Sequence, residues 1–164
     1  MKINQFALFI AFFLALSHTA NGTQDILDNI QGYYSMPSIR CTKYNQATDK
    51  IVPCAKQFKD CLLIRKIDSQ TANIELYSTQ ANQSSCAVNG TAKIVDGKLV
   101  LYFDADTGKN AQHLDFIFQN KKVLLKEHVQ EGESVKNCGV HARFEGLLFK
   151  KTDNNPGKHQ CFEG

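Results

Sequence analysis

The sequence has little net charge and only one long apolar run. Its 164 residues include 19 Lys or Arg and 16 Asp or Glu. Such a small excess gives neither the basic footprint of a nucleic-acid-binding protein nor a polybasic membrane anchor. No second apolar run follows Phe6–Leu16, and no cysteine comes directly after that run. We therefore expect no nucleic-acid partner, no stable membrane insertion and no lipid anchor.

The run Phe6–Leu16 has the features of a secretory signal peptide. It follows a single early Lys2 and is shorter than the roughly 18–20 residues that a membrane-spanning helix needs. Small residues follow it, and cleavage after Gly22 or after Ser17 fits a small-x-small pattern. We predict a signal peptide over residues 1–22, a single domain over 23–164, and a secreted or periplasmic protein. Without Lys2, 18 basic residues face 16 acidic ones.

All six cysteines lie downstream of this run. An even number of cysteines in an exported chain predicts disulfides, but six cysteines allow about 15 pairings, and the sequence leaves the pairing open. They are Cys41, Cys54, Cys61, Cys86, Cys138 and Cys161.

Three patterns raise the possibility of a chemical site, and each has a plainer interpretation. Cys138 and His141 have metal-ligand spacing, but no Cys-x-x-Cys pair accompanies them, and a disulfide with a surface histidine is favoured. A free nucleophilic thiol at Cys138 is disfavoured by the five other exported cysteines. Asp104 and Asp106 offer too few oxygen ligands for calcium, so a solvated hairpin is favoured. We predict no metal, no cofactor and no enzymatic activity.

The rest of the chain is a succession of short strands. Ile74 and Leu76 alternate with Asn73 and Glu75, and Leu114, Phe116 and Phe118 share one face, with Asp115 on the opposite one. No intervening segment has the length and period of a crossover helix, so an all-β fold is predicted: a single antiparallel up-and-down barrel of about eight strands. The predicted strands are 32–36, 61–67, 72–79, 86–95, 98–103, 112–118, 122–129 and 142–150.

The connections divide between the two ends of this barrel. Tight turns at 68–70, 96–97 and 120–121 fall at one end, and long connections at 37–60, 80–85, 104–111 and 130–141 fall at the other. Five cysteines lie in or beside the long connections, and the tail to Cys161 must return toward them; about eleven extended residues span roughly 35 Å. A short helix over 23–30, capped by Thr23 or Asp25, is expected to lie near the tight-turn end, with Ile26, Leu27 and Ile30 on one face. The segment 37–60 is expected to be irregular.

This layout resembles known families of small barrels. Gly32-Tyr33-Tyr34 after a short helix is similar in architecture to lipocalins, although no Trp is present. Cys61-Leu62-Leu63-Ile64, the step from Asn82 to Cys86, and the segment from Cys138 to Gly146 resemble small exported bacterial barrels of unassigned role. Periplasmic lysozyme inhibitors are also exported eight-stranded barrels with a disulfide, and they present a Ser-Gly-x-x-Lys-Tyr-like loop. The segments 90–94 and 133–136 do not reproduce that loop.

These features predict a non-catalytic binding protein that contacts a macromolecule, most concretely a protein, through the disulfide-bound loops at one barrel end. Inhibition of a cell-wall hydrolase such as lysozyme is the most specific form of this hypothesis. The alternative is a lipocalin-like carrier of a small apolar ligand, in which the apolar strand faces line a pocket instead of a packed core. Basic residues on the long loops either form the partner surface or are simply solvated. The candidate partner-binding residues are Lys56, Lys59, Ser134, Lys136 and His141.

Overall fold

The computed structural model describes residues 25–38, 41–54, 59–103, 111–130 and 137–162. Its elements, in chain order, are α2 (Ile26–Ile30), β1 (Gly32–Pro37), β2 (Thr42–Asn45), β3 (Lys50–Pro53), β4 (Lys59–Lys66), β5 (Thr71–Thr79), η2 (Ala81–Gln83), β6 (Ser85–Val95), β7 (Lys98–Tyr102), β8 (His113–Gln119), β9 (Lys122–His128), β10 (Leu148–Asp153) and η3 (Pro156–Lys158).

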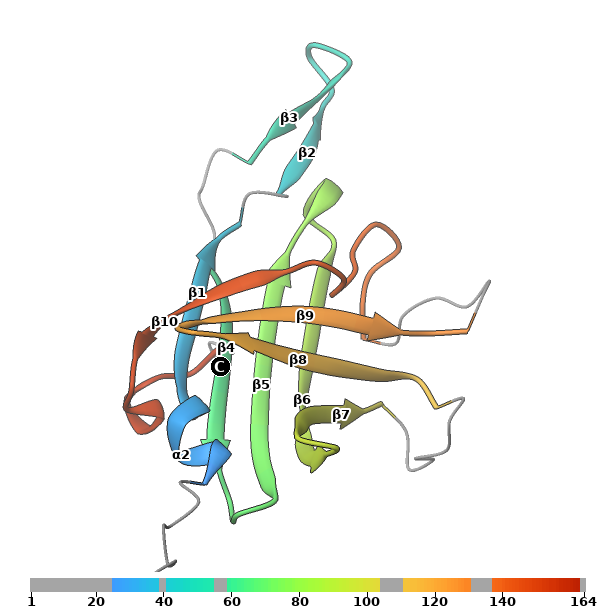
Figure 1. Cartoon of the computed structure of the whole chain (residues 1–164). Helices are drawn as coiled ribbons and strands as arrows, with labels where there is room; N and C mark the ends of the chain where they lie inside the picture. The colour runs from blue at the N-terminus through green and yellow to red at the C-terminus, as the bar shows by residue number, and fades with distance from the viewer. Residues whose placement is uncertain (1–24, 39–40, 55–58, 104–110, 131–136, 163–164) are drawn as a thin grey trace, which may run out of the picture.

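Eight of these strands form a closed barrel, which confirms the predicted fold class (Figure 1). Their order is β1-β10-β9-β8-β7-β6-β5-β4, and every pairing is antiparallel. The barrel closes where β1 pairs with β10. Closure pairs the strand edges that an open sheet would expose. Strands β2 and β3 form a separate two-stranded sheet, so β1 pairs directly with β4.

Side chains of the barrel strands fill its interior. Along β5, Ile74 and Leu76 are buried, whereas Asn73 and Glu75 are only partly covered, as the alternation predicts. Among the described residues, four aromatic rings are fully buried in the core: Tyr34, Phe116, Phe144 and Phe149. Interiors of eight-stranded barrels are narrow enough for side chains to fill them.

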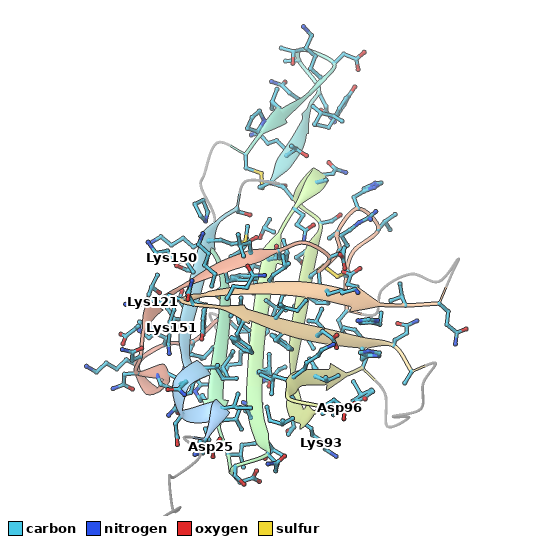
Figure 2. All side chains as sticks on the ribbon, viewed as in Figure 1. Asp25, Lys93, Asp96, Lys121, Lys150 and Lys151 are labelled. Atoms are coloured by element: carbon cyan, nitrogen blue, oxygen red, sulfur yellow. A yellow bond between two sulfur atoms is a disulfide. The ribbon has the colours of Figure 1, made fainter. Side chains whose placement is uncertain are left out.

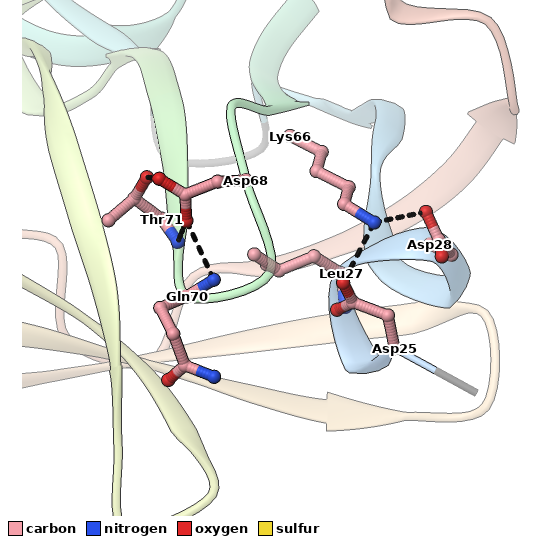
Figure 3. A network of polar contacts seen from close by, with 7 residues as sticks. All are labelled: Asp25, Leu27, Asp28, Lys66, Asp68, Gln70 and Thr71. Atoms are coloured by element: carbon pink, nitrogen blue, oxygen red, sulfur yellow. Dashed lines mark hydrogen bonds and ion pairs between the residues drawn. The ribbon is translucent and has the colours of Figure 1, made fainter. Parts of the chain in front are cut away.

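Tight turns close one end of the barrel. Asp96 and Gly97 both adopt positive φ angles, +50° and +75°, as a two-residue hairpin turn requires. In the β4–β5 turn, the Asp68 carboxylate accepts hydrogen bonds from the backbone N–H groups of Gln70 and Thr71, both at 2.8 Å (Figure 3). These backbone hydrogen bonds lower the pKa of Asp68.

Helix α2 packs at this same end. Asp25 caps the helix by accepting a hydrogen bond from the Leu27 N–H at 3.0 Å, and Leu27 and Ile30 are buried in the core. Lys66, at the end of β4, lies 2.8 Å from a carboxylate oxygen of Asp25 and 2.7 Å from one of Asp28 (Figure 3). Its hydrogen bond lowers the pKa of Asp25. These contacts attach the helix to the strand that it covers.

Ile26 and the last strand differ from the sequence prediction. Ile26 is 45 % exposed, so it does not share the buried face of Leu27 and Ile30. The last strand begins at Leu148 instead of residue 142, because a turn with Gly146 at φ +73° precedes it. In the strand as observed, Phe149 faces inward and is buried, and Leu148 is 43 % exposed.

The segment 37–60 is more regular than expected. It contains the β2–β3 hairpin, whose turn is stabilised by the Asn45 side chain, which accepts a hydrogen bond from the Ala47 N–H at 3.0 Å. Asp49 completes the turn with φ +52°. Asx side chains favour turns for this reason.

All six cysteines are paired, and the structure selects one of the pairings left open by the sequence. Cys41–Cys54 joins the two ends of the hairpin, and Cys86–Cys138 joins β6 to the connection that follows β9. Cys61–Cys161 links the tail to β4, so the tail does return along the barrel.

Candidate binding site at the disulfide-bound end of the barrel

The β2–β3 hairpin projects beyond the barrel at the end opposite α2 (Figure 1). Tyr44 and Ile51 are directly opposite each other in the two strands and share one face of the hairpin. Tyr44 is 52 % exposed and Ile51 is 74 % exposed. The hairpin is anchored at its base by the Cys41–Cys54 disulfide and by the Thr42 hydroxyl, which accepts a hydrogen bond from the Asn82 N–H at 3.1 Å.

The connection between β9 and β10, described from residue 137, lies against the same end. Cys138 pairs with Cys86 both through the disulfide and as an isolated β-bridge. The Ala87 N–H donates to the Asn137 carbonyl at 2.9 Å, and the Gly139 N–H donates to the Ser85 carbonyl at 2.8 Å. This connection therefore extends the sheet beside β6.

Gln80 holds the next part of this connection by its side-chain amide. Its Nε2 donates to the Arg143 carbonyl at 2.7 Å, and its Oε1 accepts from the Arg143 N–H at 3.2 Å. Gln80 is buried, so both hydrogen bonds are shielded from water. They fix the backbone of Arg143 without using its guanidinium, and the residue is exposed.

Phe144 anchors the connection in the core. Its ring is fully buried and stacks on Phe103, with 5.9 Å between ring centroids. Glu127 accepts a hydrogen bond from the Phe144 N–H, and burial raises the pKa of the Glu127 carboxyl. The segment that the sequence predicts as the start of a strand is instead a turn whose Phe144 and Leu147 side chains are buried in the core.

A cleft of about 590 Å³ lies between the hairpin, η2 and this connection. Three of the residues that line it are apolar and exposed: Tyr44, Ile51 and Val140. Val140 is 94 % exposed and so has almost no contact with the rest of the protein. His141 and Arg143 add polar and basic groups to the same wall. Exposed apolar groups gathered beside basic ones are typical of interaction sites.

The structure brings one of the predicted partner-binding residues into this cleft. His141 lines it, whereas Lys59, the exposed first residue of β4, does not. Lys56, Ser134 and Lys136 lie outside the described residues. The disulfide favoured for Cys138 over metal ligation and over a free thiol is confirmed, because Cys138 is bonded to Cys86 and His141 is exposed.

Sequence reasoning missed the apolar part of the cleft. Tyr44 and Ile51 lie in the segment expected to be irregular, although Asn45 and Asp49 between them are turn-forming residues that could have indicated a hairpin. Val140 is a single apolar residue between Cys138 and His141, and no periodic pattern points to it.

A second cluster of polar side chains lies outside the cleft. His113, Asp115 and His128 have the mutual distances of metal ligands. No sequence motif indicates this cluster, since the two histidines are 15 positions apart in the chain and meet only through strand pairing.

Comparison with known proteins gives no relative for this chain: no protein-family model, curated protein or solved structure matches it. Within the described residues, no helix is both long and apolar enough to cross a membrane. The three disulfides are compatible with an extracellular or periplasmic location.

Proposed function

We propose that this protein is exported and acts as a non-catalytic binding protein, with the disulfide-bound end of the barrel as its contact surface. The observation that carries the proposal is the cleft in which Tyr44, Ile51 and Val140 are exposed although disulfides anchor both of its walls. Exposed apolar side chains that gather in one place mark interaction sites. Restrained loops also lose less conformational entropy on binding.

The occupant we propose is the acidic active-site cleft of a cell-wall hydrolase such as lysozyme. Glycoside hydrolases hold a pair of carboxyl groups in a cleft. The projecting hairpin offers a narrow apolar wedge with Lys43 and Lys50 on it, and Arg143 and His141 lie beside the wedge. Opposite charges on the two surfaces would speed association and fix the orientation of the complex. The resemblance to periplasmic lysozyme inhibitors is one of architecture, and it agrees with this choice.

The barrel interior gives less support to the alternative of a small-ligand carrier. Buried side chains occupy the described interior, including the rings of Phe116, Phe144 and Phe149. Asp60 and Gln80 are also buried, and the Asp60 carboxylate accepts a hydrogen bond from the Ser78 hydroxyl at 2.5 Å. We therefore assign binding to the outside of the barrel end.

The test measures inhibition of cell-wall hydrolysis and the affinity for the hydrolase by surface plasmon resonance. Ile51→Asp should weaken binding by about thirtyfold, the loss of one 2 kcal/mol hot spot. Ile67→Asp is the matched control, because Ile67 is 58 % exposed but lies in the turn at the opposite end. It should leave binding unchanged.

A second pair of variants tests the charges. Arg143→Glu should slow association and make it more sensitive to salt, as expected for a steering charge. Lys121→Glu is its control, because Lys121 lies with Lys150 and Lys151 away from the hairpin (Figure 2). If no cell-wall hydrolase is inhibited, the assignment of the partner is wrong. If the control variants prove the more damaging ones, the binding end is wrong.

A further inference from the structure

The hairpin of β8 and β9 carries a cluster of three potential metal ligands on its outer face. His113 and His128 are directly opposite each other in the antiparallel pair, and Asp115 follows His113 by two positions on β8, so it points to the same side. The alternate residues Leu114 and Phe116 are buried in the core. The strand register alone therefore places two imidazoles and a carboxylate together.

The distances within the cluster are short. The Asp115 carboxylate has Oδ2 at 3.1 Å from His128 Nε2 and Oδ1 at 3.7 Å from His113 Nε2. The three ligand atoms all lie within 4.8 Å of one another. The imidazole rings are stacked, with centroids 4.2 Å apart. Asp115 is only 7 % exposed, which is unusual for a carboxylate on the outer face of a barrel.

A backbone carbonyl orients one of the imidazoles as in metal sites. His113 Nδ1 lies 2.8 Å from the Ala111 carbonyl oxygen. A carbonyl only accepts, so Nδ1 carries a hydrogen, and Nε2 is the nitrogen that faces Asp115. Histidines that ligate metals commonly donate their other N–H to a carbonyl or a carboxylate in this way.

The geometry points to a binding site for a divalent transition-metal ion, specifically Zn²⁺, formed by His113, Asp115 and His128. Two imidazole nitrogens and one carboxylate oxygen are a ligand set that Zn²⁺ prefers, and water would complete a tetrahedron. The disulfides leave no cysteine thiolate to compete for the ion. The site is distinct from the cleft, which none of these three residues lines.

Binding requires two rearrangements that the surroundings permit. Because the rings are stacked, the ring of His128 must turn about its Cβ–Cγ bond, while His113 keeps its hydrogen bond to Ala111, so that one nitrogen of each ring lies about 2.0–2.2 Å from the same ion. The side chain of His128 is 35 % exposed, which leaves it room to turn. Lys98 Nζ lies 3.9 Å from Asp115 Oδ2 and would compete with the metal, but its side chain is 62 % exposed and can swing into solvent.

The proposal is tested by titrating the purified, untagged, oxidised protein with Zn²⁺ in a calorimeter, with Co²⁺ as a spectroscopic probe. We expect one ion per chain, and a visible Co²⁺ spectrum of tetrahedral character. His128→Ala and Asp115→Asn should each weaken Zn²⁺ binding by about tenfold or more. NMR of the wild-type imidazoles gives a readout without any substitution: His113 and His128 signals should shift together on adding Zn²⁺.

His159→Ala is the matched control. His159 Nε2 lies 2.9 Å from Asp153 Oδ2, so it forms a histidine–carboxylate pair in the same protein, but without a second histidine among the described residues. Its loss should not change Zn²⁺ affinity. The proposal is overturned if the folded wild-type protein binds no Zn²⁺ at micromolar concentrations, if the imidazole signals that shift are those of His141 or His159, or if His159→Ala weakens binding as much as His128→Ala.

Discussion

Replacing Phe144 by alanine is expected to lower the free energy of unfolding by about 4 kcal/mol. The side chain is fully buried, and a buried Phe removes roughly 150–250 Å² from water, worth about 25 cal/mol per Å². Alanine keeps part of this burial, whereas the cavity and the lost stacking on Phe103 add to the cost, and measured Phe→Ala substitutions in cores total about 3–5 kcal/mol. The prediction tests whether residues 138–147 are an integral plug of the barrel or a loop lying on it.

Urea unfolding with the disulfides intact gives the measurement. The chain has no tryptophan, so far-ultraviolet circular dichroism is the suitable signal. With a denaturant slope of about 2 kcal/mol/M, the midpoint should fall by about 2 M.

Val140→Ala is the matched control in the same connection. Val140 is 94 % exposed, so the substitution should change stability by less than about 0.5 kcal/mol while it weakens partner binding. If Phe144→Ala shifts the unfolding free energy by less than about 1 kcal/mol, the plug does not contribute to the core, and the cleft wall that it anchors is not fixed.

Two further predictions concern pH and the disulfides. Burial raises the pKa of Glu127 above its ordinary value of 4.5, so between 4.5 and the raised value the folded state binds more protons than the unfolded state, and stability falls as pH rises through that range. The Glu127→Gln variant should therefore be more stable than the wild type at neutral pH, and this difference should vanish below about pH 4.5. Thermal unfolding of both proteins across this pH range measures it, and a stability difference that does not change with pH would refute the prediction. Removing the Cys61–Cys161 disulfide, which closes a loop with a sequence separation of 100, should lower the free energy of unfolding by about 4–5 kcal/mol. Removing Cys41–Cys54, with a separation of 13, should lower it by about 3 kcal/mol. Urea midpoints of the two double-serine variants check the order, and the reverse order would contradict it.

The barrel was predictable because its signals are local. Alternation along β5 and turn residues such as Asp96-Gly97 identify strands and hairpins one at a time, and antiparallel neighbours then follow one another around the barrel. The structures of residues 37–60 and 142–150 were harder to predict from the sequence. The hairpin is too short for a clear period, and the position of β10 depends on Phe144 finding space in the core, which no local pattern encodes.

The two candidate sites depend on contacts between distant segments. The cleft needs the hairpin, η2 and Val140 to meet, and the His–Asp–His cluster needs the register of β8 with β9. Asp115 shows the limit most clearly. It lies opposite the buried face of β8, as the alternation predicts, but the alternation does not indicate that it is almost fully covered and lies beside two histidines.

The joining of β1 to β10 also constrains the order of folding. Tyr33 pairs with Asp153, so the first and last strands of the barrel must meet, although the chain delivers them at opposite times. In a chain that emerges from its N-terminus, through a ribosome or a translocation channel, β1 can pair with β4 early, but its other edge stays open until residues 148–153 arrive. The disulfide of Cys61 likewise cannot form until Cys161 has emerged. Until residues 148–153 pair with β1, that strand keeps an open edge and Cys61 lacks its partner, and an open strand edge favours aggregation. Folding helpers that cover strand edges or reshuffle disulfides would act on this protein mainly before the last strand is in place.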